Sequence, residues 1–139
     1  MPKNILERYS SDLATRVESA NDATKRAVSL AVCKWAVEST IPDDATVRSA
    51  LAALGNSACG EQGLMNALQR HVDDLDLAYF EAQKAKCDFF PLSVKARVAN
   101  AVLFALDPDP FRAATHALYE LCAALGTELV QGEVNRRLS

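Results

Sequence analysis

The chain has 139 residues, of which 50% are hydrophobic and 24% charged, and its net charge at pH 7 is −3. This length and balance exclude a disordered chain and predict a single globular domain over residues 1–139 with one core. The 15 Lys and Arg residues are scattered, which disfavours a nucleic-acid-binding surface because such a surface needs clustered bases.

We predict an all-α fold, a bundle of six to seven helices without a sheet. Alanine, the strongest helix former, occurs 24 times, whereas Gly and Pro occur five times each. Aromatic residues make up only 6% of the chain, so small and aliphatic side chains must form most contacts between helices.

The first two helices are expected over residues 4–19 and 22–39. Asn21 or Asp22 is suited to cap the second helix, because a short polar side chain can accept hydrogen bonds from its first backbone N–H groups. Between residues 27 and 37 the second helix is apolar almost all round, which is typical of a central helix contacted on several sides.

A third helix follows the break at Pro42, since proline cannot continue the second one. Asp43 or Asp44 is expected to start this helix. Gly55 is expected to end it as a left-handed residue. Residues 55–63 hold three of the five glycines and are predicted to form the main loop.

The longest helix is predicted over residues 61–86, where no proline interrupts the chain. Its apolar residues are spaced three, four, three, four and three apart, which predicts one buried stripe along the helix. The residues of this stripe are Met65, Leu68, Val72, Leu75, Tyr79 and Ala82.

The same helix carries the clearest concentration of acidic residues in the chain. Asp73, Asp76 and Lys84 lie off the apolar stripe and are expected to face solvent. An exposed acidic face can dock on a basic partner, although most such faces are simply solvated. We take four residues as candidates for binding a protein partner: Asp73, Asp74, Asp76 and Glu81.

Three more helices are expected in the C-terminal third of the chain. The first begins near Ser93, is apolar on most sides and is predicted to be a second central helix. The next begins at the break formed by residues 107–110, with Pro110 suited to its first turn, and ends at Gly126. The last occupies the residues after Gly126.

The cysteines show no metal or disulfide pattern. They are far apart and form no C-x-x-C pair, so we expect reduced thiols. They are Cys33, Cys59, Cys87 and Cys122. Cys33 and Cys122 lie on apolar helix faces, where cysteine behaves as a small hydrophobic residue. Cys59 is the one in the glycine-rich loop, but no spacing links it to a histidine as a catalytic pair would require.

The two histidines each have a carboxylate on the same helix face: His71 with Asp74, and His116 with Glu120. Two such pairs can ligate a metal when they converge between helices. No recognised metal-binding motif accompanies them. We therefore predict no catalytic residue, no cofactor and no metal, and a protein that is not an enzyme.

Membrane insertion is not predicted, because no apolar run approaches the roughly 20 residues that a membrane helix needs. The N-terminus has no apolar segment of signal-peptide length either. We expect a cytoplasmic protein and leave its oligomeric state open.

Residues 27–53 resemble the alanine-rich helical immunity proteins that accompany bacterial toxins. The similarity consists of an apolar helix followed by Pro42-Asp43-Asp44 and then Val47-Arg48-Ser49-Ala50-Leu51. This resemblance implies a small, cytoplasmic bacterial protein that binds and blocks one toxin domain.

Two functional hypotheses result. In the first, the protein is a protein-binding module of immunity or inhibitor type, which occludes a basic partner through the acidic face. In the second, it is a small helical ligand-binding or regulatory protein. The aromatic residues that could line an apolar ligand site in the second hypothesis are Trp35, Phe89, Phe90, Phe104 and Phe111.

Overall fold

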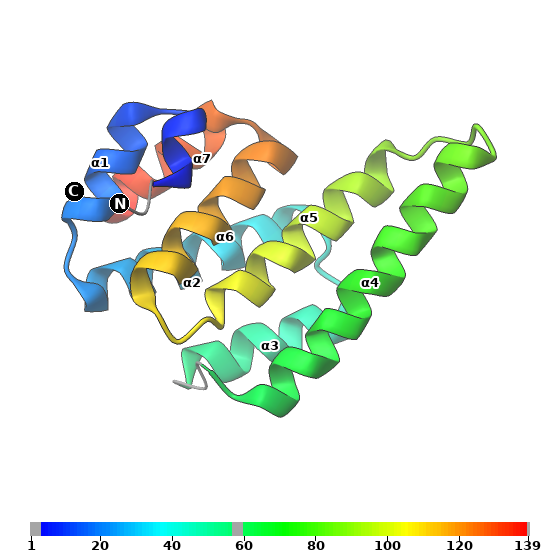
Figure 1. The fold of residues 1–139 in the computed structure, drawn as a ribbon, viewed down its shortest axis with the longest axis horizontal. Helices are drawn as coiled ribbons and strands as arrows, with labels where there is room; N and C mark the ends of the chain where they lie inside the picture. Colours follow the sequence, from blue (N-terminus) through cyan, green and yellow to red (C-terminus); the bar gives the residue numbers. More distant parts are fainter. Residues whose placement is uncertain (1–3, 57–59, 139) are drawn as a thin grey trace.

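The computed structural model describes residues 4–56 and 60–138, and it confirms an all-α fold with no strand in this part of the chain (Figure 1). One short 3-10 helix precedes seven α-helices. Their bounds are η1 Ile5–Arg8, α1 Ser11–Ser19, α2 Asp22–Thr40, α3 Ala45–Gly55, α4 Gln62–Lys84, α5 Phe90–Ala105, α6 Pro110–Leu125 and α7 Thr127–Leu138.

The two helices predicted to be central do occupy the centre of the bundle. α2 packs against α3, α5, α6 and α7, and α5 packs against α2, α3, α4 and α6. Val32, Val102 and Leu118, from α2, α5 and α6, are completely buried. Cys33 and Cys122 are buried among these apolar side chains, as their positions on apolar helix faces predicted.

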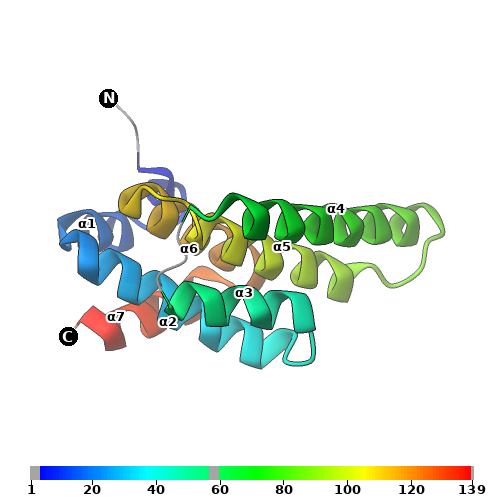
Figure 2. The same cartoon turned by 90° about the horizontal axis from the view of Figure 1, so that it is seen from below.

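α4 and the beginning of α5 form a hairpin that extends beyond the other helices (Figure 2). α4 packs mainly against α5, and the N-terminal half of α4 makes a smaller contact with α3. In the described part of the chain, the C-terminal half of α4 lies beside α5. One long side of α4 is therefore open to solvent.

The first predicted helix is in fact two elements, so the prediction of one helix over residues 4–19 was wrong. Asn4 caps η1 by accepting a hydrogen bond from the Leu6 N–H at 3.0 Å. Ser10 adopts an extended backbone and caps α1 by accepting from the Leu13 N–H at 3.1 Å. A capping serine in the middle of the run separates the two helices.

Three other helix ends also differ from the sequence prediction. Gly55 is the last residue of α3 rather than a left-handed residue beyond it, and Asn56 is the C-cap, with φ −99°. α5 begins at Phe90 rather than near Ser93, because Pro91 fits a first helical turn, where its missing N–H needs no acceptor. α4 ends at Lys84, and Lys86 has a left-handed φ of 57°.

The predicted caps of α2 and α3 are confirmed, and an aspartate of the predicted break at residues 107–110 caps α6. Asn21, Asp44 and Asp109 cap α2, α3 and α6 with their side chains, and Pro110 lies in the first turn of α6. Gly126 ends α6 with φ 96°, a conformation that residues with a Cβ rarely adopt.

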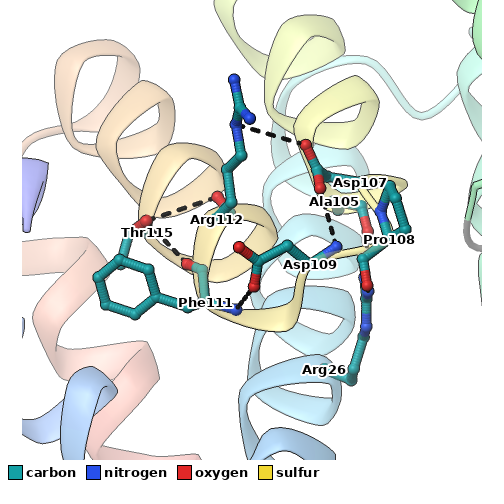
Figure 3. A network of polar contacts seen from close by, with 8 residues as sticks. All are labelled: Arg26, Ala105, Asp107, Pro108, Asp109, Phe111, Arg112 and Thr115. Carbon is teal, nitrogen blue, oxygen red and sulfur yellow. Dashed lines mark hydrogen bonds and ion pairs between the residues drawn. The ribbon is translucent and has the colours of Figure 1, made fainter. Parts of the chain in front are cut away.

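The side chain of Arg26, on α2, binds the turn between α5 and α6 (Figure 3). Arg26 donates hydrogen bonds to the carbonyl oxygens of Ala105, at 3.2 Å, and Pro108, at 2.6 Å. The carbonyl group of Ala105, at the C-terminus of α5, lacks a partner within the helix, and one guanidinium group can satisfy it together with the turn carbonyl of Pro108. This turn is thereby tied to the central helix.

Candidate functional site

The buried stripe predicted on the longest helix is confirmed on α4; we call it the inner stripe. Leu68 and Val72 are buried, and the other four members, Met65, Leu75, Tyr79 and Ala82, are partly buried. Every residue of α4 from Gln83 onward is exposed, since the helix there projects beyond its neighbours. The inner stripe holds α4 against α5 and α3.

A second stripe runs along the opposite side of α4, and all of its members are exposed. This outer stripe consists of Asn66, Arg70, Asp73, Leu77, Phe80 and Lys84. Leu77 and Phe80 lie at its centre and are 57% and 55% exposed. Neither residue is among the candidates predicted from the sequence, although their distance from the inner stripe on a helical wheel is a signal that could reveal them.

The four acidic candidates are all exposed, but they point in different directions around α4. Asp73 lies on the outer stripe. Asp76 and Glu81 lie on its two flanks, and Asp74 lies toward α3, on the side of the helix that carries His71. The carboxylates therefore surround the exposed pair Leu77 and Phe80 rather than forming one compact cluster.

Asp76 also lines a shallow groove of about 270 Å³ between α4 and α5. Across this groove, Arg97 of α5 forms an ion pair with Glu120 of α6 at 3.2 Å. Partial burial raises the pKa of the Asp76 carboxyl, the neighbouring charge of Asp73 raises it further, and Arg97 lowers it. The groove thus borders the outward face of α4 and contains both carboxylates and a base.

Aromatic side chains continue this surface toward the tip of the hairpin. The ring of Tyr79 lies 5.4 Å from that of Phe80 and 5.6 Å from that of Phe89, measured between centroids. Phe90 follows and is 68% exposed. Large apolar side chains at such exposure are typical of surfaces that other molecules cover.

The histidines do not pair with the carboxylates that the sequence suggested. His71 Nε2 lies 2.7 Å from Asp44 Oδ2 of α3, not against Asp74. His116 stacks beside Phe104, with ring centroids 5.1 Å apart, while Glu120 is paired with Arg97.

Within the described residues, no group of three or more His, Cys, Asp or Glu side chains could hold a metal ion. Cys59, the thiol considered for a catalytic pair, lies outside the described residues.

The aromatic residues proposed to line a ligand site do not come together. Trp35 of α2 and Phe104 of α5 are partly buried against the core, and the Lys25 amine lies over Phe111, 5.8 Å from the ring centroid. Phe89 and Phe90 are at the hairpin tip. A more apolar groove of about 420 Å³ lies instead between α2 and α3, and residues such as Leu30, Val37 and Leu51 line it.

Comparison with known proteins finds no family model, no curated protein and no solved structure that matches this chain. Among the helices of the described residues, none combines the length and the apolar character needed to cross a bilayer.

Proposed function

We propose that this protein is a protein-binding module that docks on a basic partner through the outward face of α4. The proposal includes the role of a bacterial immunity or inhibitor protein that covers a toxin domain. One observation carries it: Leu77 and Phe80, each more than half exposed, lie together on an open helix face surrounded by carboxylates. Protein interfaces commonly have such an apolar or aromatic centre and a polar rim.

The charges around this centre favour a basic partner. Asp73, Asp76 and Glu81 are exposed next to Leu77 and Phe80, and Lys84 is the one base on the C-terminal half of the outer stripe. Carboxylates at an interface rim mainly raise the association rate and select against acidic competitors. The apolar pair would supply the affinity once it is desolvated.

The shape of α4 suits occlusion of a cleft. A helix of 23 residues is about 34 Å long, and its C-terminal half extends beyond the bundle. A projecting helix of this kind can enter a groove on a partner and bury its apolar residues there. Blocking a basic active-site cleft requires no chemistry from the protein itself.

Charge reversal on the two flanks of the outer stripe tests the proposal. The double variant Asp76→Lys/Glu81→Lys should lose capture of a basic partner from the native cells, measured by pull-down with quantitative mass spectrometry. The matched control is Glu18→Lys/Glu38→Lys, which makes the same change in net charge at exposed positions on α1 and α2. Capture by the control should equal that by the unmodified protein.

Equal capture by both double variants would show that the acidic flanks do not bind the partner. Loss of capture by both would assign the effect to net charge rather than to a site. Circular dichroism should show the same helix content in all three proteins, since every substituted side chain is exposed.

A second candidate function, a small ligand-binding protein, is favoured by the apolar groove between α2 and α3. Its volume of about 420 Å³ is in the range of small-molecule sites, and its charged lining residues are two bases, Lys34 and Arg48, and one acid, Glu38. A fatty acid would match an apolar floor with basic groups at the rim. Thermal-shift measurements with fatty acids of increasing length test this role, and no change in melting temperature for any of them would remove it.

A further inference from the structure

We propose that the outward face of α4 also binds a second copy of this chain, forming a reversible antiparallel helix pair. The dimer would cover Leu77 and Phe80 when no other partner is bound. The self-association stands on the geometry of α4 alone. Its role in masking the partner site rests on the proposed function.

The outer stripe has the spacing of a coiled-coil seam. Its six residues, from Asn66 to Lys84, follow one another in steps of four, three, four, three and four. This alternation gives an average of 3.5 residues per turn, which keeps one line of side chains facing a partner helix. All six side chains are exposed, so no other part of the described chain occupies that line.

The stripe is complementary to itself when reversed. In an antiparallel pair related by a two-fold axis, residues at equal distances on either side of the axis face each other. An axis passing between Ala78 and Tyr79 places Leu77 opposite Phe80 of the second copy, each about 2 Å along the helix from the axis. Asp73 then faces Lys84 of the second copy, each about 8 Å from the axis.

Symmetry doubles each of these contacts. Two apolar pairs form the centre of the interface, and one Asp–Lys pair closes it at each end. Asp76 and Glu81 lie on the flanks of the outer stripe, away from the line along which the two helices touch. The same symmetry places Asp76 near its own copy on one flank and Glu81 near Asp74 of the second copy on the other, so like charges at the exposed edges keep the association weak.

Other alignments of the two helices are less favourable. Shifting the axis to Leu75 sets Asp73 against Leu77 of the second copy, and Arg70 against Phe80. Each charged group would then be desolvated against an apolar side chain without an ion-pair partner. Only the axis between Ala78 and Tyr79 places apolar side chains on apolar ones and opposite charges together.

The interface is small, because it uses one helix face from each copy, so we expect a weak association that responds to concentration. Weak self-association suits a protective role: a partner with a basic rim can displace the second copy. The partner and the second copy would compete for Leu77 and Phe80, so partner binding should dissociate the dimer.

A charge-swap series tests the dimer on the full chain by sedimentation velocity over a range of concentrations. The variants Asp73→Lys and Lys84→Asp each place like charges opposite each other at both ends, and each should weaken self-association at least about tenfold. The double variant Asp73→Lys/Lys84→Asp restores opposite charges and should recover the dimer. Glu18→Lys, the same charge change at an exposed position on α1, should leave it unchanged.

A chain that stays monomeric at every concentration would overturn the proposal, and so would a double variant that fails to recover the dimer lost in both single variants. The flank variant Asp76→Lys/Glu81→Lys separates this inference from the proposed function, since it should lose the basic partner and keep the dimer. If no partner is captured while the charge-swap series behaves as expected, the dimer stands and the proposed function fails.

Discussion

One carboxylate, that of Asp44, holds two helices at once through its two oxygens. Oδ1 accepts a hydrogen bond from the Val47 N–H at 3.0 Å and so caps α3, while Oδ2 lies 2.7 Å from Nε2 of His71 on α4. The side chains of Asp44 and His71 are largely shielded from solvent, with 15% and 27% of their surface exposed. This contact links α4, whose main support is α5, to the start of α3.

The two roles of Asp44 can be separated by substitution. Asp44→Ala removes the cap and the contact with His71 and should lower the free energy of unfolding by roughly 2 kcal/mol. Asp44→Asn keeps a good capping group and should cost less than half as much. Urea denaturation measures both. Equal losses for the two variants would show that the cap contributes little.

Arg26 should be important for stability although it is partly exposed. Arg26→Ala leaves the carbonyl groups of Ala105 and Pro108 without their donor, and a loss of roughly 1–2 kcal/mol is expected. Arg26→Lys keeps the charge but cannot offer two parallel N–H groups, so it should recover only part of that loss. Full recovery by lysine, in the same urea titration, would mean that charge alone explains the effect.

The described cysteines should differ sharply in reactivity. Burial raises the pKa of Cys33 to about 12. It also raises the pKa of Cys122 to about 11, against the opposing effect of a hydrogen bond with Thr127. Cys87, in contrast, is exposed. In a Cys59→Ser protein at neutral pH, alkylation should modify Cys87 at least about a hundredfold faster than the buried pair. Peptide mass spectrometry follows each site. Rapid modification of Cys33 in the folded protein would contradict this packing.

Asp76 should make the fold less stable as pH rises through the weakly acidic range. Its pKa is raised in the folded state, mainly by partial burial and then by Asp73, so the folded protein keeps a proton that the unfolded chain has lost. The free energy of unfolding therefore falls as the pH rises from the ordinary aspartate pKa to the raised one, and it stays lower at neutral pH. Asp76→Asn should remove this fall.

Urea midpoints measured from about pH 3 to pH 7 provide the test, since this range spans the ordinary carboxyl pKa values. The asparagine variant should be more stable than the unmodified protein at neutral pH and equal to it at the acidic end. Glu81→Gln, at an exposed position on the same helix, is the control. An identical pH profile for Asp76→Asn and the unmodified protein would contradict the raised pKa.

The sequence predicted the features of this fold that depend on local chemistry. The inner stripe of α4 follows from helical periodicity, and the caps at Asn21, Asp44 and Asp109 follow from short polar side chains at helix starts. The break at Ser10 was missed because a serine can equally lie inside a helix. Gly55 was misassigned because a terminal glycine fits both the last turn and the residue beyond it.

The candidate site was only partly predictable, because it depends on which faces remain uncovered. The exposure of Asp73 and Asp76 follows from their distance from the inner stripe. That Leu77 and Phe80 are exposed depends on the absence of a helix packed over α4 in the described chain, which periodicity alone does not determine. The contact between His71 and Asp44 joins residues 27 positions apart and depends on how α3 and α4 pack.

The most direct test of the central claim, that the outward face of α4 is a docking surface, is site-specific photo-crosslinking in the native cells. A photoreactive residue replaces either Phe80 or Leu129 of α7, which are exposed to nearly the same extent, 55% and 59%. Position 80 should give crosslinks to a basic protein, to a second copy of the chain, or to both, and position 129 should give neither. Equal crosslinking from both positions, or none from position 80, would contradict the claim.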